Sequence, residues 1–147
     1  MPLVAYAVLL LIGMTTVVHY GVLSGLYRWL PGFRIPSRTK VLFVIFGAFI
    51  AHALEIAVYG LTFYAMVNFL DAGGLSTAHS ISIPGCMYFS AETYTSLGFG
   101  DVIPDGPIRL LVGAEALNGL LLIGWSASFL CISMERFWAS PNNRHKL

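Results

Sequence analysis

The order of hydrophobic and polar positions along the chain predicts three membrane-crossing helices. The stretch Leu3–Tyr27 contains no charged side chain, and the stretch Val41–Leu70 is interrupted by only a few polar ones. A third apolar stretch runs from about Ile108 to Met134. Each stretch exceeds the roughly 20 residues that an α-helix needs to cross the hydrocarbon core of a bilayer. We therefore expect an all-α membrane protein and not a soluble domain.

A shorter helix is predicted between the second and third stretches. Pro84–Ser96 has a proline suited to a first helical turn, and Gly98 ends the helical pattern. At about 1.5 Å per residue this helix covers only about 20 Å, too little to cross a bilayer. The irregular segment 98–104 follows, and such backbone is tolerated at membrane depth only inside protein or beside water. The outline is that of a re-entrant pore, although an ordinary extracellular loop has the same outline.

Composition and charge narrow the class of protein. The chain is 57% hydrophobic and 10% charged, whereas soluble domains carry about 25% charged residues. Its net charge is +1 and it has no basic tract, so a nucleic-acid partner is not expected. The spacing of its polar residues shows no nucleophile with a base and no cluster of metal ligands. An enzyme is therefore the least favoured class, and no cofactor is expected.

The basic residues orient the predicted elements. They gather between the first two apolar stretches and after the third, and only Arg109 lies elsewhere. The positive-inside rule places both groups in the cytoplasm. In a multi-pass protein of the cell membrane, the N-terminus and the loop opening then lie outside and the C-terminus is cytoplasmic. The two groups are Arg28, Arg34, Arg38 and Lys40, and Arg136, Arg144 and Lys146.

The segment Thr95–Asp101 carries the most specific motif, Thr-Ser-Leu-Gly-Phe-Gly-Asp. A K⁺ ion that loses its hydration shell must be met by stacked rings of carbonyl oxygens. Successive carbonyls point to one axis only if right- and left-handed backbone conformations alternate. Glycines at alternate positions, here Gly98 and Gly100, make the left-handed conformation accessible. The segment resembles the potassium-channel signature Thr-Thr-Val-Gly-Tyr-Gly-Asp.

The resemblance implies a K⁺ selectivity filter with K⁺ as the permeant ligand. The carbonyl oxygens of Ser96, Leu97, Gly98 and Phe99 would bind K⁺, with the Ser96 hydroxyl at the inner end and Gly100 closing the filter. The chain departs from the signature at three positions. Ser96 stands in place of Thr, Leu97 in place of Val or Ile, and Phe99 in place of Tyr.

The residues before the filter extend the resemblance. Phe89–Thr93 looks like the aromatic-Ser-x-Glu-Thr pore helix of bacterial two-helix potassium channels. In that family the glutamate pairs with the filter aspartate behind the filter, and Glu92 and Asp101 keep the same spacing. The resemblance implies that Glu92, Asp101 and Thr95 support the filter.

The residues after the filter match the family's inner helix. Arg109 corresponds to its start and Gly119 to its hinge glycine, so that the resemblance covers Pro84–Cys131. Helical spacing places Ile123 and Ala127 on one stripe that lines the cavity. Gly119 is either a gating hinge or a packing glycine on the lipid side, and the sequence leaves both open.

The resemblance also implies the organisation of the chain and its assembly. Residues 1–30 form an extra N-terminal transmembrane helix, residues 41–134 the pore domain, and residues 135–147 a short cytoplasmic tail. One chain supplies one re-entrant loop, so a ring of carbonyls needs several copies related by rotational symmetry; the family implies a homotetramer in the lipid bilayer. The extra helix should pack on the second through Gly13, Gly21 and Gly25, since small residues allow close approach.

Ionisable residues inside the apolar stretches are costly there and are candidates for function. His52 and Glu55 are three residues apart and share a helix face; they are a structural buried pair, a proton sensor or a metal pair. Glu115 faces either the hydroxyls of the pore helix or the cavity. His19, alone in the first stretch, should be satisfied in packing.

The sequence thus favours a potassium-selective channel subunit that conducts K⁺ passively. The substitutions at Ser96 and Leu97 keep a weakly selective cation channel open as an alternative. A non-conducting pore-like subunit is a third reading, which the retained glycines disfavour. No stretch carries the arginine ladder of a voltage sensor.

Overall fold

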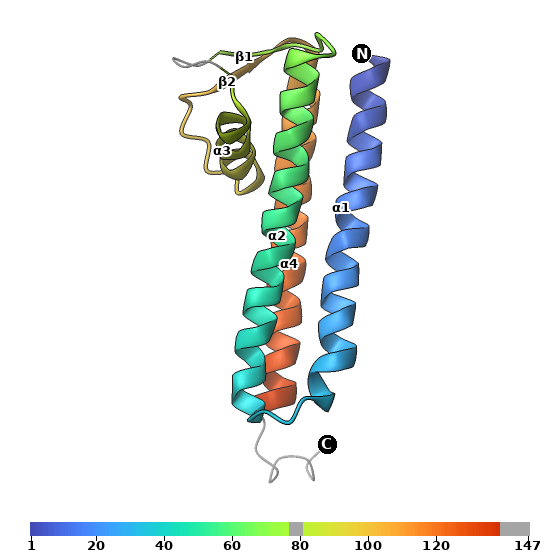
Figure 1. Ribbon diagram of the computed structural model, residues 1–147, viewed down its shortest axis with the longest axis vertical. Helices are drawn as coiled ribbons and strands as arrows, with labels where there is room; N and C mark the ends of the chain where they lie inside the picture. The colour runs from blue at the N-terminus through green and yellow to red at the C-terminus, as the bar shows by residue number, and fades with distance from the viewer. Residues whose placement is uncertain (77–80, 139–147) are drawn as a thin grey trace.

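The computed structural model of the chain describes residues 1–76 and 81–138. Three long helices run side by side, and a short helix lies beside one end of them (Figure 1). The helices are α1 (Pro2–Trp29), α2 (Ser37–Asn68), α3 (Ile83–Tyr94) and α4 (Arg109–Trp138), with one-turn 3₁₀ helices η1 (Leu30–Gly32) and η2 (Gly106–Ile108) and strands β1 (Gly74–Ser76) and β2 (Ile103–Asp105).

The three long helices confirm the predicted spans. Each is long enough and apolar enough to cross a membrane. Their bounds differ from the predicted ones by a few residues, and α4 continues past Met134 to Trp138. The first residues of the predicted tail, 135–138, are therefore helical. The remainder of that tail lies outside the described residues.

The short helix α3 is the predicted helix that cannot cross the bilayer. The Ser82 side chain caps its start by accepting a hydrogen bond from the Gly85 amide at 3.3 Å, and Pro84 lies in its first turn. Its 12 residues span only about 18 Å. It lies beside α2 at the end of the bundle where α1 begins (Figure 1), which places the N-terminus and the loop at the same end, as the sequence predicted.

A pair of short strands was not predicted. β1 and β2 pair antiparallel, with Gly74 opposite Asp105. At Gly73, φ is +129° and an added Cβ would lie 2.3 Å from the Asp105 carbonyl oxygen, so only glycine fits. Strands of three residues leave no periodic pattern in a sequence. They tie the segment after α2 to the segment before α4.

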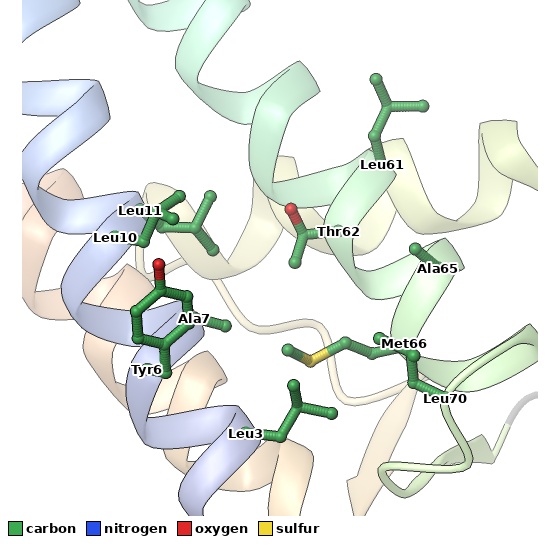
Figure 2. Close-up of a pocket in the computed structure, with 10 residues that line it drawn as sticks. All are labelled: Leu3, Tyr6, Ala7, Leu10, Leu11, Leu61, Thr62, Ala65, Met66 and Leu70. Carbon is green, nitrogen blue, oxygen red and sulfur yellow. The ribbon is translucent and has the colours of Figure 1, made fainter.

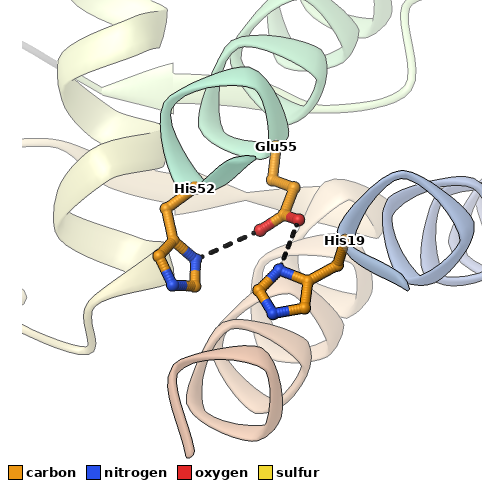
Figure 3. Close-up of side chains that lie close together, drawn as sticks. All are labelled: His19, His52 and Glu55. Atoms are coloured by element: carbon orange, nitrogen blue, oxygen red, sulfur yellow. Dashed lines mark hydrogen bonds and ion pairs between the residues drawn. The ribbon is translucent and has the colours of Figure 1, made fainter. Parts of the chain in front are cut away.

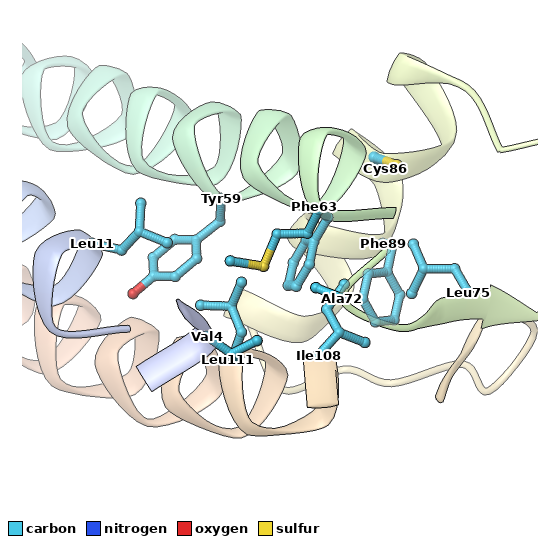
Figure 4. Close-up of a cluster of buried hydrophobic side chains, with 11 residues drawn as sticks. Val4, Leu11, Tyr59, Phe63, Ala72, Leu75, Cys86, Phe89, Ile108 and Leu111 are labelled. Carbon is cyan, nitrogen blue, oxygen red and sulfur yellow. The ribbon is translucent and has the colours of Figure 1, made fainter. Parts of the chain in front are cut away.

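The core lies where α2, α3 and α4 meet. Phe63 of α2 and Phe89 of α3 pack edge to face with ring centroids 5.1 Å apart. Val4 and Leu11 bring α1 into the same cluster (Figure 4). The pore-domain helices and the N-terminal helix therefore share one core.

The prediction that α1 packs through its glycines is wrong. A Cβ added at Gly13, Gly21 or Gly25 would meet nothing within 4 Å. The close contact instead uses a glycine of α2, because a Cβ at Gly47 would lie 2.7 Å from the Leu26 side chain. Moreover, α1 contacts both α2 and α4.

Near its start, α1 is separated from α2 by an apolar groove of about 330 Å³ (Figure 2). Leu3, Tyr6 and Leu10 line it from α1, and Leu61 and Ala65 line it from α2. Its surfaces carry no charged group, so this half of α1 is held by the Val4 and Leu11 contacts and not by ion pairs.

Candidate functional site: the pore loop and the helices behind it

The loop after α3 has left-handed backbone at every second residue. The φ angles are +58° at Ser96, +55° at Gly98 and +79° at Gly100. The left-handed conformations expected at the two glycines are confirmed. Ser96 was not expected to share them, and a non-glycine residue in this region costs of order 1–3 kcal/mol unless its surroundings hold it there.

The last turn of α3 holds the loop in this shape. The Thr93 carbonyl accepts a hydrogen bond from the Ser96 amide at 2.9 Å. The Glu92 carbonyl accepts from the amides of Leu97 at 2.8 Å and Gly98 at 3.3 Å. These hydrogen bonds hold Ser96, the residue with strained backbone, and Gly98 against the last turn of α3.

The side chain of Glu92 makes a further contact with the loop. It is 4% exposed, and its Oε2 accepts a hydrogen bond from the Phe99 amide at 3.3 Å. Among the described residues, Glu92 has no hydrogen bond with Asp101. Glu92 therefore touches the filter segment by a contact other than the predicted one, and the role of the Glu92 and Asp101 pair stays a prediction.

Tyr88 is a residue of this region that the sequence analysis missed. Its ring is parallel to that of Phe99, with centroids 6.4 Å apart and an interplanar angle of 1°. Desolvation raises the pKa of Tyr88, and the nearby carboxylates of Asp101 and Glu92 raise it further. The signal was available, since Tyr88 precedes Glu92 by one helical turn and shares its face.

The outer surface of the loop is open in the single chain. Leu97 is 60% and Phe99 66% exposed, and a Cβ at Gly98 or Gly100 would meet nothing within 4 Å. The hydroxyl of Thr95 donates to the Ala91 carbonyl at 2.8 Å, so it caps the end of α3. In the part of the chain that the structure describes, no other segment closes a ring around these carbonyls.

Helix α4 meets the end of α3 backbone to backbone. Gly119 is buried, and a Cβ there would lie 2.1 Å from the Tyr94 carbonyl oxygen. Gly119 therefore faces the pore helix, and its placement on the lipid side is excluded. Ile123 and Ala127 are exposed on α4, and their role in a cavity stays a prediction.

Glu115 lies behind the pore helix. It is fully buried, and its Oε1 accepts a hydrogen bond from the Ser90 hydroxyl at 2.5 Å. Ser90 also lies 2.9 Å from the Ile56 carbonyl of α2. Within the described part of the chain, Glu115 Oε2 has no hydrogen-bond partner. The prediction that Glu115 faces the pore-helix hydroxyls is confirmed for Ser90.

A third buried carboxylate, Glu55, belongs to a hydrogen-bonded cluster with side chains from all four α-helices. Glu55 Oε1 lies 2.9 Å from His19 Nδ1, and Oε2 lies 3.2 Å from His52 Nδ1 (Figure 3). The Tyr94 hydroxyl donates to Oε2, and Ser126 Oγ lies 3.2 Å from His19 Nε2 and 3.1 Å from His52 Nε2.

This cluster corrects two expectations. His52 and Glu55 do form the predicted buried pair, but His19 joins them and is not an isolated packing residue. Among the described residues, the two histidines and the carboxylate bring their ligand atoms within 4.8 Å of one another. The sequence showed no ligand cluster, because His19 is distant in the chain and only the packing of α1 on α2 brings it close.

One further polar contact joins α1 to the pore domain. The Asn118 side-chain amide of α4 donates to Thr15 Oγ1 at 2.8 Å and to the Tyr59 hydroxyl at 3.2 Å. All three side chains are buried. Hydrogen bonds of this kind help transmembrane helices to associate, because lipid offers no alternative partner.

Three membrane-spanning helices with a pore helix and a re-entrant loop define a multi-pass channel protein. Residues 39–136 match the family described as "Ion channel", and the chain belongs to this two-transmembrane ion-channel family of the potassium-channel type. No curated protein and no solved structure matched the chain. The matched residues run from the start of α2 to near the end of α4, so α1 lies outside the match.

Proposed function

We propose that the chain is one subunit of a tetrameric, potassium-selective channel with its filter at Ser96–Gly100. The observation that carries this proposal is the left-handed backbone at Ser96, Gly98 and Gly100. An alternation with a period of two residues turns successive carbonyls to one side of the loop, and it is what a carbonyl-lined filter requires. Leu97 and Phe99 then serve by their carbonyls, while their side chains pack behind the filter.

The exposed loop supports assembly of several copies, and the family resemblance implies four. One chain supplies a single column of carbonyls, and a closed ring needs rotational symmetry. The exposed side chains of Leu97 and Phe99 are then covered by the neighbouring subunits. Ile123 and Ala127 of α4 line the cavity below, and the partial negative charge at the C-terminus of α3 stabilises a cation there.

In the proposed orientation the N-terminus lies outside and the C-terminal end of α4 lies in the cytoplasm. The basic residues at the end opposite α3 support this orientation. There the Arg136 guanidinium lies 4.5 Å from the centre of the Tyr27 ring, and Trp138 Nε1 donates to the Arg38 carbonyl at 3.4 Å. Such aromatic and basic side chains anchor helix ends at the membrane interface.

The test uses purified protein in liposomes that carry a K⁺ gradient. The wild type should develop a K⁺ diffusion potential, and an Na⁺ gradient should produce far less. Gly98→Ala should abolish conduction, because φ of +55° disfavours any residue with a Cβ. Gly124→Ala is the matched control, since its Cβ would meet nothing within 4 Å.

Each alternative function has its own outcome in this experiment. Equal permeability to Na⁺ and K⁺ in the wild type would falsify selectivity and favour a weakly selective cation channel. An assembled oligomer with no ion flux under any gradient would instead indicate a non-conducting subunit.

A further inference from the structure

Two imidazoles and a carboxylate converge at one buried point between α1 and α2. His19 and Glu55 are fully buried and the His52 side chain is 19% exposed. The Nδ1 atoms of both rings point at the carboxylate of Glu55 (Figure 3). We propose that His19, His52 and Glu55 form a site for a divalent transition metal ion, with Zn²⁺ as the best match.

The donor types and distances fit this ion. Zn²⁺ accepts imidazole nitrogen and carboxylate oxygen at bonds of about 2.0–2.2 Å, in tetrahedral geometry. Ligand atoms of such a site lie about 3.3 Å apart. Here Nδ1 of His19 lies 2.9 Å from Glu55 Oε1, and Nδ1 of His52 lies 3.2 Å from Oε2. The third separation stays within 4.8 Å, so small movements of the rings complete the geometry.

A fourth ligand lies in the same cluster. The Tyr94 hydroxyl is 2.9 Å from His52 Nδ1 and donates a hydrogen bond to Glu55. On metal binding this hydroxyl would supply the fourth ligand beside the two imidazoles and one carboxylate oxygen. The Glu55 carboxylate supplies the negative charge that a divalent cation needs in apolar surroundings.

Ser126 provides the outer contact that metal-binding histidines require. Such histidines donate the N–H of the other ring nitrogen to an acceptor, which fixes the tautomer. Ser126 Oγ lies within 3.1 and 3.2 Å of the two Nε2 atoms, and a hydroxyl oxygen has two lone pairs for them.

The same hydrogen bonds are less well satisfied in a metal-free cluster in which both imidazoles are neutral. If each Nδ1 donates to the carboxylate, each Nε2 is an acceptor. Ser126 has a single hydroxyl hydrogen to donate, and the Nε2 atoms of His19 and His52 are two acceptors. A metal ion at the Nδ1 atoms removes this shortage. A largely apolar groove of about 180 Å³ lies between α2 and α4, and His52 and Ser126 of the cluster are among the residues that line it.

The consequence is that a bound metal ion would cross-link α1 to α2 and α3. His19 belongs to α1, while His52 and Glu55 belong to α2. Tyr94 is the last residue of α3, directly before the filter segment. A bound ion would hold α1 against the base of the pore helix.

The experiment titrates the purified full chain in detergent, stripped with a chelator, with ZnCl₂. Calorimetry should find one Zn²⁺ per chain, and X-ray absorption should show nitrogen and oxygen ligands without sulfur. Glu55→Gln and His19→Gln should lower the affinity by about 100-fold or more, and Ser126→Ala by about 10- to 100-fold. Glu115→Gln, which changes a buried carboxylate that contacts Ser90 and not the cluster, is the matched control and should leave the affinity unchanged.

Three results overturn the proposal. The first is a wild-type chain that binds no stoichiometric Zn²⁺, which leaves the cluster as a proton-sharing hydrogen-bond network. The second is an absorption spectrum with sulfur ligands, which points to Cys86 or Cys131. The third is undiminished binding in both Glu55→Gln and His19→Gln. If those variants do not fold, the stoichiometry and spectrum of the wild type decide.

Discussion

Helix α4 meets two neighbours in opposite ways. Against α3 its backbone is in direct contact, since the place of a Gly119 Cβ lies 2.1 Å from the Tyr94 carbonyl oxygen. Against α1 it uses polar side chains, with Asn118 donating to Thr15 and Ser126 lying 3.2 Å from His19. The first contact tolerates no added atom, whereas the second depends on matched donors and acceptors.

The difference shows what each helix contributes in a membrane. Lipid is as apolar as the side chains, so helices associate through close packing and hydrogen bonds. Helices α3 and α4 use close packing at Gly119, which fixes the position of the loop after α3. The added helix α1 uses hydrogen bonds, although it carries three glycines that leave open space. A glycine in these transmembrane helices therefore has structural meaning only where a neighbouring helix approaches it closely, as at Gly119 and Gly47.

The largest expected effect is that of Gly119→Ala. The new methyl group overlaps the Tyr94 carbonyl, so α3 and α4 must separate, at a cost above about 3 kcal/mol. We expect loss of the assembled oligomer and of K⁺ flux, measured by size-exclusion chromatography and in liposomes. Gly113→Ala, where the added Cβ meets nothing within 4 Å, is the control. An oligomer yield equal to wild type for Gly119→Ala would contradict this contact.

Replacing the carboxylate that binds α1 should have the next largest effect. Glu55→Gln leaves one oxygen for His19, His52 and Tyr94, and puts an amide donor against a donor, at a cost of about 2–3 kcal/mol. Glu115→Gln keeps the single contact with Ser90 and should cost less than about 1 kcal/mol. Thermal unfolding in detergent compares the two variants. Equal losses of stability would show that the Glu55 cluster contributes no more to the stability of the chain than the Glu115 contact with Ser90.

A smaller effect is expected at the other polar contact of α1. Asn118→Leu removes two hydrogen bonds, to Thr15 and Tyr59, and should cost about 1 kcal/mol, since such bonds average about 0.6 kcal/mol in membranes. Thr15→Val should give about half of this loss. The same unfolding measurement applies, and a loss above that of Glu55→Gln would reverse the order of the two contacts.

The smallest effect should come from the glycines of α1. Gly21→Ala and Gly25→Ala meet no atom within 4 Å, and alanine is a better helix former than glycine by about 1 kcal/mol. We expect unchanged or slightly raised stability, with unchanged oligomer yield. A clear loss of assembly would mean that these glycines touch another subunit.

The sequence predicted the parts of this fold that depend on local pattern. Length and hydropathy predicted the three membrane spans. The predicted helix before the loop was distinguished from them because it is too short to cross a bilayer. The alternating glycines gave the backbone of the loop. The sequence did not reveal the left-handed Ser96, because only the carbonyls of α3 enforce it.

The contacts that depend on helix rotation were not predictable. The position of Gly119 in the sequence does not tell whether it faces lipid or α3. His19 belongs to the Glu55 cluster because of how α1 is turned against α2. In the same way, the face of α1 that carries Gly21 was expected at the contact and lies away from it.

The polar face that the pore domain turns toward α1 has an evolutionary consequence. Glu55, Asn118 and Ser126 lie within the residues that match the family, whereas their partners His19 and Thr15 lie outside them. A pore domain that lost α1 would present these groups to hydrocarbon, where each unsatisfied polar group costs several kcal/mol. Loss of α1 alone would therefore destabilise the remaining helices in the membrane. A change that removes α1 would have to be accompanied by apolar substitutions at Glu55, Asn118 and Ser126.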